Sequence, residues 1–233
     1  MTWELNFQVG ICYIIFMLKP FFAKQEFYHI YNRGVDKRDI FMDSDDLYRF
    51  LKSMNDFNVQ DPIGSIYEHS FKLGSPTPKL KKLVNFVAYC LNQNHYHFIL
   101  EPLVDNGIQK FMHKLSTGYT NYFNEKYKRS GSLFQGGYKA IHINSNEYLL
   151  HASVYINLNY KIHKNLNKEW MKKLPISSFK EYTEKTTKPF CAKDIVLGQF
   201  NNTKEYKIFC EEILPEILRK KEEEKELKCM LLE

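Results

Sequence analysis

The stretch LVNFVAYCLNQNHYHFIL, residues 83–100, decides the fold of this chain. Its first part, Leu83 to Leu91, is apolar and rich in residues that favour strands, so it predicts a β-strand. The polar residues 92–94 predict a turn. The segment from His95 to Leu100 then predicts the returning strand of a hairpin.

Two imidazoles occupy alternate positions of that second strand. Because strand side chains alternate between faces, His95 and His97 are expected on one side and Tyr96 and Phe98 on the other. Two imidazoles side by side on a rigid strand can chelate one divalent metal ion. The spacing alone is weak evidence, because it arises by chance in many proteins and is also compatible with a structural or surface role.

The segments around the hairpin complete the pattern of an α+β domain. We expect a loop over residues 56–82 because proline and glycine recur there. The other elements follow in chain order: a strand over 27–32, a helix over 43–55, a long helix over 107–127, a strand over 138–143 and a helix over 146–159. The order β-α-β-β-α-β plus a helix predicts a ferredoxin-like antiparallel sheet with helices on one face.

The helix over 146–159 carries a second set of polar groups. Residues four apart share a helix face, so His151, Tyr155 and Asn159 are expected to form one stripe. A phenolate can act as a nucleophile, and an amide oxygen can be a metal ligand. The alternative for Tyr155, one of sixteen tyrosines, is a half-buried aromatic side chain that only packs.

Four segments in order resemble a known family, the small single-tyrosine transposases of the His-hydrophobic-His (HUH) endonuclease superfamily. The similarity is strongest to the branch of REP-associated tyrosine transposases, and it covers roughly residues 21–165. The segments that carry it are FYHIYNRG at 27–34, NQNHYHF at 92–98, GSLFQGGYK at 131–139 and YINLN at 155–159.

The resemblance implies a function as a metal-dependent endonuclease and strand transferase on single-stranded or hairpin DNA. In such an enzyme Tyr155 would attack the scissile phosphate, form a 5′-phosphotyrosine intermediate and free a 3′ hydroxyl. A divalent metal, Mg²⁺ or Mn²⁺, would be held by His95, His97 and Asn159. His151 shares the face of the nucleophile and is a candidate to assist proton movement, although an ordinary helix histidine is the alternative.

The resemblance also indicates a group of DNA contacts. Residues at the strand ends and in the GSLFQGGYK segment form this group: Arg33, Gln135, Tyr138 and Lys139. Two positions depart from the family pattern. Tyr160 stands where a proline usually follows the helix asparagine, and Gly137 replaces a common arginine. These departures would alter helix termination and the grip on DNA.

The composition is compatible with a polyanionic partner and a reducing compartment. The net charge is +6, and residues 160–190 hold eight lysines against three glutamates. A solvated basic face explains the lysines equally well. The five cysteines include no Cys-x-x-Cys pair, which argues against a zinc ribbon and a disulfide framework and favours the bacterial cytoplasm.

We expect three regions along the chain. Residues 1–20 form an extension whose apolar run is too short to span a membrane, and the true start is expected near Met17. Residues 21–165 form the catalytic domain. Residues 166–233 form a basic accessory tail with small helices expected over 179–182, 191–196 and 203–218.

Two other functions remain open on the sequence alone. The same fold could serve a domesticated, non-cleaving hairpin DNA-binding protein or repressor. It could also serve a plain RNA-binding domain, although that function would leave the histidine pair unused. Either a monomer or a homodimer is compatible with the sequence.

Overall fold

The computed structural model of the chain describes residues 20–61, 81–163 and 168–230. Its centre is a four-stranded sheet in the order β2-β3-β1-β4, in which every neighbouring pair is antiparallel. The strands are β1 (Phe27–Arg33), β2 (Val84–Asn92), β3 (His95–Pro102) and β4 (Lys139–Ile143). This order confirms the α+β, ferredoxin-like arrangement, with the histidine strand β3 at an inner position.

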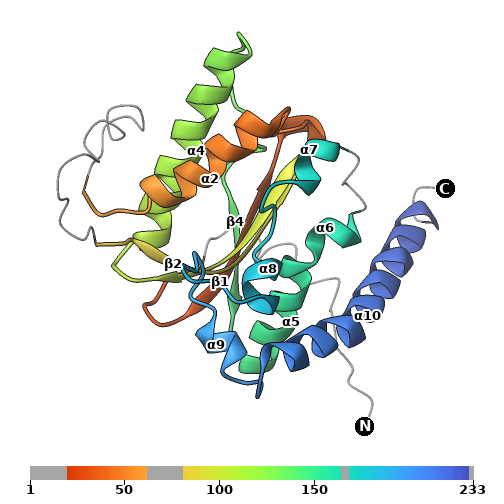
Figure 1. The fold of residues 1–233 in the computed structure, drawn as a ribbon. Coiled ribbons are helices and arrows are strands. Elements are labelled where there is room, and N and C mark those ends of the chain that lie inside the picture. The colour runs from red at the N-terminus through yellow and green to blue at the C-terminus, as the bar shows by residue number, and fades with distance from the viewer. Residues whose placement is uncertain (1–19, 62–80, 164–167, 231–233) are drawn as a thin grey trace.

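Two helices cover one face of the sheet (Figure 1). They are α2 (Ser44–Asp56) and α4 (Gly107–Lys126), and the short 3₁₀ turn η1 (Val35–Lys37) precedes α2. Asp43 caps α2, because its side chain accepts a hydrogen bond from the Asp46 backbone N–H at 3.0 Å. The first core fills the space below these helices and includes Tyr96 and Phe98. The side-chain alternation predicted for β3 is therefore confirmed.

A second layer covers the opposite face of the sheet. It holds α5 (Asn146–Asn157), α6 (Asn159–Ile162), α8 (Phe179–Thr183), α9 (Asp194–Leu197) and α10 (Thr203–Met230), whereas α7 (Glu169–Lys172) packs Met171 into the first core. A second core joins apolar side chains of the sheet, such as Ile99, to α5 and to Val196 and Tyr206 of the later helices. The expectation of helices on only one face thus missed that α5 and the tail helices cover the other face.

The tail is tied to the domain by a chain of buried hydrogen bonds. Asn157 donates to the hydroxyl of Tyr206 at 2.9 Å, and that hydroxyl also lies 3.1 Å from Ser153 Oγ. Ser178 Oγ donates to Asn157 Oδ1 at 2.6 Å and accepts from the Tyr89 backbone N–H at 2.9 Å. Helix α5 is thereby held between the sheet and the tail helices.

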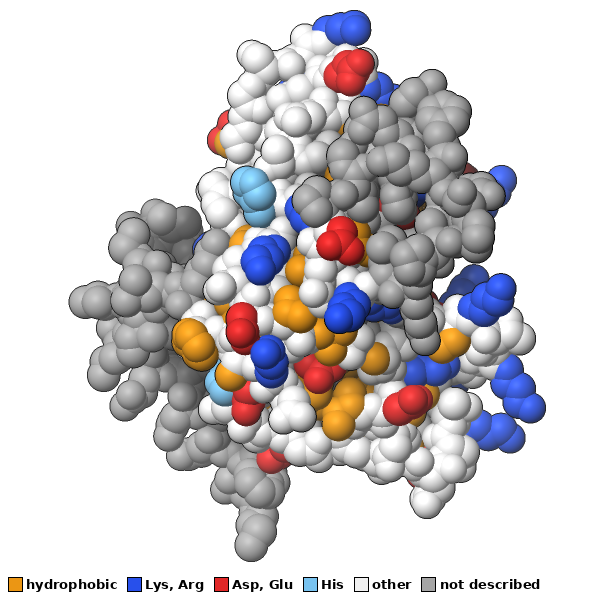
Figure 2. Space-filling view, turned by 90° about the vertical axis from the view of Figure 1, so that its left-hand side faces the viewer, with side chains coloured by type: hydrophobic (Ala, Val, Ile, Leu, Met, Phe, Trp, Pro, Cys, Tyr) orange, Lys and Arg blue, Asp and Glu red, His pale blue; other side chains and the backbone are white. Residues whose placement is uncertain are grey.

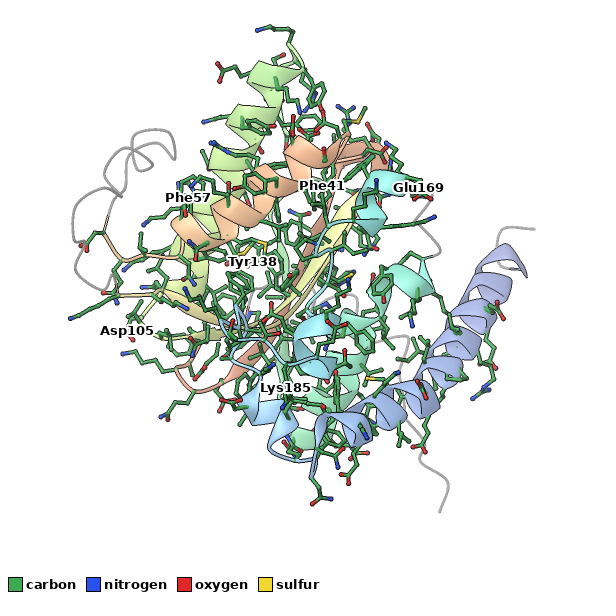
Figure 3. All side chains as sticks on the ribbon, viewed as in Figure 1. Phe41, Phe57, Asp105, Tyr138, Glu169 and Lys185 are labelled. Atoms are coloured by element: carbon green, nitrogen blue, oxygen red, sulfur yellow. The ribbon has the colours of Figure 1, made fainter. Side chains whose placement is uncertain are left out.

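Side chains fill the layers on both sides of the sheet (Figure 3). On the face drawn in Figure 2, basic and acidic side chains are interspersed, so charge of one sign is not gathered among the described residues of that face. Within the described residues, no helix is long and apolar enough to cross a membrane. The expected extension over 1–20 lies outside the described residues except for its last residue, as does most of the expected loop over 56–82.

Candidate active site

A cavity of about 590 Å³ opens beside the ends of β1 and β3. Most of the residues that the sequence singled out line it: Arg33, His95, His97, Gln135, Lys139 and Tyr155. Asn159 is fully buried and does not line the cavity, but it contacts His95, with its Oδ1 3.4 Å from His95 Nε2. Residues from β1, β3, β4, α5 and the loop before β4 therefore meet at one site.

The two histidines of β3 stand side by side on the face that carries α5. Their ring centroids lie 5.2 Å apart with the planes at 89°. His97 is buried, whereas His95 is partly exposed at the end of the hairpin. Because the strand is paired on both sides, with β2 and with β1, the spacing of the two rings is fixed by the sheet.

A hydrogen bond orients each imidazole through its Nδ1. The Nδ1–H of His95 donates to Asn94 Oδ1 at 2.6 Å, which leaves Nε2 of His95 with a lone pair. Nδ1 of His97 lies 2.8 Å from Nε2 of His29 on the neighbouring strand. Such partners fix the tautomer and orientation of histidines that bind metals.

Burial keeps these rings neutral. Burial, together with the smaller effects of His163, Lys221 and Arg33 and against the hydrogen bond with Asn159, lowers the pKa of His95 to about 3. Burial also lowers the pKa of His97 well below its ordinary value. A neutral imidazole is the form that can bind a metal ion.

An asparagine pair completes the polar cluster. The amide Nδ2 of Asn92, at the end of β2, donates to Asn159 Oδ1 at 2.8 Å and lies 3.0 Å from His95 Nε2. Both asparagines are almost completely buried. Asn92 Oδ1 and Asn159 Nδ2 have no hydrogen-bond partner.

Tyr155 reaches the cavity from α5. Ser145 caps this helix by accepting from the Tyr148 backbone N–H at 3.1 Å. The ring of Tyr155 lies 5.7 Å from that of His97 and 6.1 Å from that of His29, measured between centroids. The helix breaks at Leu158, so Asn159 begins the separate turn α6.

Basic side chains form the rim of the cavity. Arg33 Nε donates to Gln135 Oε1 at 2.5 Å, and the Gln135 backbone N–H donates to the Arg33 carbonyl at 2.9 Å. Lys139, paired with Tyr31 in the sheet, and Lys37 of η1 also line the cavity. Gln135 thus holds the side chain of Arg33 and also lines the cavity.

Two of the residues singled out lie elsewhere. Tyr138, labelled in Figure 3, is buried in the first core, on the α4 side of the sheet. His151 packs its ring against Phe209 of α10, with the centroids 5.9 Å apart, and does not line the cavity. Tyr160, in the place of the usual proline, packs against both cores.

Several neighbours of the site were not foreseen. The sequence gave Asn92 to a turn, and His29 was not among the residues that it singled out. His163 lies with its ring 4.6 Å from that of His95, and Lys221 of α10 lies 3.0 Å from its Nδ1. The spacing of His163, one turn beyond Asn159, was the one available signal; Lys221 is too distant in sequence to be placed.

Among the described residues, no three His, Cys, Asp or Glu side chains are arranged to hold a metal ion together. The amide oxygen of Asn159, 3.4 Å from His95 Nε2, is a further protein ligand available to a metal at the two histidines.

The comparison with known families matches this part of the chain. The model of the family described as "Transposase IS200 like" matches residues 77–159. The chain resembles the IS200-like transposases. The IS200-like segment contains β2, β3, α4, β4 and α5, and with them His95, His97, Tyr155 and Asn159. The match supports a transposase-type role in DNA processing.

One solved structure is also similar. It is a REP-associated tyrosine transposase bound to a REP hairpin, at 13% identity and a TM-score of 0.49, and the alignment covers 74% of this chain and 88% of that one. No curated protein matches the chain.

Proposed function

We propose that this chain is a metal-dependent endonuclease and strand transferase that acts on single-stranded DNA at hairpin-associated sites. The observation that supports this function best is the meeting of three kinds of group in one cavity. They are the phenol of Tyr155, the neutral imidazoles of His95 and His97, and the basic rim that includes Arg33 and Lys139.

The donor set fits a divalent cation. His95 Nε2 and Asn159 Oδ1 lie 3.4 Å apart, and two adjacent ligands of an octahedral Mg²⁺ are about 3 Å apart. His95, His97 and Asn159 would hold the ion, and the amide oxygen shifts a site that imidazoles alone would give to Zn²⁺ towards Mg²⁺ or Mn²⁺. A bound ion would supply stabilisation of the charge that develops on the non-bridging phosphate oxygens.

Tyr155 is the proposed nucleophile. Its Oη would bond to the scissile phosphorus as the bond from phosphorus to the 3′ oxygen breaks, so that the 3′ oxygen leaves and takes up a proton. A phenol has an ordinary pKa of about 10, so a nearby positive charge helps to form the phenolate. Lys139 lines the same cavity and supplies such a charge. Attack by a 3′ hydroxyl on the phosphotyrosine would rejoin DNA without ATP.

The basic rim would position the DNA backbone. A guanidinium matches the oxygens of a phosphate, and Gln135 Oε1 fixes the direction of Arg33 by accepting a hydrogen bond from its Nε. We assign the catalytic domain to residues 21–165 and the accessory region to 166–233, whose helices cover the second face of the sheet.

The test uses hairpin oligonucleotides taken from DNA that flanks the gene, with Mn²⁺ or Mg²⁺. A 5′-phosphotyrosine joins the protein to the 3′ fragment, so only an oligonucleotide labelled at its 3′ end should give a covalent band. We expect the band with the wild type and with Tyr148→Phe, a control on the same helix outside the cavity. Tyr155→Phe, His95→Ala and EDTA should each abolish it.

Other outcomes would identify other functions. Tight hairpin binding without cleavage would indicate the non-cleaving binder. Cleavage by Tyr155→Phe would show that another residue is the nucleophile, and a preference for RNA over hairpin DNA would favour the RNA-binding domain.

A further inference from the structure

The side chain of Asn92 lies beside the proposed metal ligands His95 and Asn159, but the proposed function gives it no role. Its Nδ2 lies 2.8 Å from Asn159 Oδ1 and 3.0 Å from His95 Nε2. The two hydrogens of this amide nitrogen therefore face the lone pairs of two proposed metal ligands. The opposite end of the amide, Oδ1, is buried and has no hydrogen-bond partner.

These three atoms form a small triangle whose edges are 2.8, 3.0 and 3.4 Å. Three ligands on one face of an octahedral Mg²⁺ form a triangle with edges of about 3 Å. The triangle formed by Asn92, Asn159 and His95 thus has the size of a ligand face. One corner carries a donor nitrogen where a ligand oxygen would be required.

An asparagine amide has nearly the same shape in both orientations, so a rotation of 180° exchanges Oδ1 and Nδ2. With Oδ1 at that corner, lone pairs of all three groups would converge. Without a cation this arrangement is repulsive, whereas the observed orientation satisfies both Asn159 and His95. The cation and the amide hydrogens therefore compete for the same lone pairs.

We infer that Asn92 is a further metal ligand, whose amide turns over when a divalent cation binds. The inference rests on the metal site of the proposed function and adds a second amide oxygen to it. Asn92 is not needed to orient His95, because Asn94 already holds Nδ1 of that ring. With four protein ligands, an octahedral ion keeps two positions for phosphate oxygens or water.

Titration of the full-length protein with Mn²⁺, followed by the EPR signal of the free ion, tests this role without DNA or cleavage. Asn92→Ala removes the ligand and should weaken Mn²⁺ binding by at least about tenfold. Asn92→Asp supplies a charged oxygen and removes the competing hydrogens, so it should bind Mn²⁺ more tightly than the wild type. Asn85→Ala, an amide on the same strand that contacts Glu101, is the matched control and should bind as the wild type does.

Each result separates the alternatives, and circular dichroism shows that each variant is folded. If Asn92→Ala binds Mn²⁺ as tightly as the wild type, or more tightly, the inference is refuted. The amide would then only donate hydrogen bonds to Asn159 and His95 in the absence of metal. A folded Asn92→Asp that binds more weakly would also refute it.

The wild type and His95→Ala distinguish this failure from failure of the proposed function. If the wild type binds no Mn²⁺, or binds it equally well after His95→Ala, the proposed metal site itself is wrong. If His95 is required and Asn92 is not, only the role of Asn92 is wrong.

Discussion

The hydroxyl of Tyr206 makes the most direct prediction about the tail, because one oxygen connects α10 to α5. Tyr206→Phe keeps the ring in place and removes only this oxygen. Tyr206 is fully buried, and burial holds its pKa well above the ordinary value, so the phenol stays protonated and neutral. Its oxygen accepts from Asn157 Nδ2 at 2.9 Å and lies 3.1 Å from Ser153 Oγ.

The magnitude follows from what the two partners lose. Ser153 Oγ still donates to the Leu150 carbonyl at 2.7 Å, so its donor remains satisfied. Asn157 keeps its bond from Ser178, but one buried N–H loses its only partner described here. A buried donor without a partner costs about 1–3 kcal/mol, so we expect a loss of about 2 kcal/mol in the free energy of unfolding.

Urea unfolding of the wild type and Tyr206→Phe measures this loss, and the slope of the transition should be unchanged. In a chain of this size the same loss lowers Tm by roughly 4–8 °C. Tyr148→Phe, at an exposed position of α5, is the control and should change stability by less than about 0.5 kcal/mol. Equal stabilities of Tyr206→Phe and the wild type would refute the buried connection between α10 and α5.

Two further predictions concern a cation and an imidazole. Lys126→Met should destabilise the fold by about 3 kcal/mol at pH 7, because Lys126 pairs with the fully buried Asp46 at 2.8 Å. Lys126 lowers the pKa of the Asp43 carboxyl below its ordinary value of 3.8, although burial opposes this shift. The resulting stabilisation is fully present above pH 3.8 and is lost as the pH falls through the lower pKa of the folded state. The stability difference between Lys126→Met and the wild type should therefore shrink in acid. Urea unfolding at pH 7 and pH 3 measures this difference, and an equal difference at both pH values would contradict the pairing. His29→Phe removes the partner of His97 Nδ1 and should weaken Mn²⁺ binding by about 10- to 100-fold, whereas unchanged affinity in the titration would exclude a positioning role.

The hairpin and the two faces of β3 could be predicted because they depend on local alternation. His95 and His97 face the same way whatever lies around the strand, and Tyr96 and Phe98 must then enter the opposite core. The caps at Asp43 and Ser145 are equally local, since each needs only a backbone N–H three residues away. The order of elements then restricts the sheet to few topologies.

The contacts around the site could not be predicted in the same way. His29 meets His97 because β1 and β3 are paired in one register, and Asn92 meets Asn159 because α6 is packed onto β2. Tyr138 was expected at the DNA surface, but its side chain, directly before β4, packs into the first core. Each outcome depends on long-range packing, which a motif does not encode.

The tail shows the same limit. Its short helices α8 and α9 begin near the expected positions, but α10 extends to Met230 rather than ending near residue 218. Phe190 packs against Phe86 and Tyr89 of β2. That the tail packs onto α5 and completes the second core follows from apolar side chains spaced over some forty residues, too thinly for a local pattern to reveal.

The buried hydrogen bonds that hold α5 between the sheet and the tail helices also limit how two copies of the chain could associate. An exchange of α5, which carries Tyr155, between two protomers would have to break the buried hydrogen bonds of Asn157 with Tyr206 and Ser178. It would also have to open the second core. Such an exchange requires partial unfolding, which is slow on the scale of catalysis. We therefore expect Tyr155 to stay beside the histidine pair of its own chain when two copies associate.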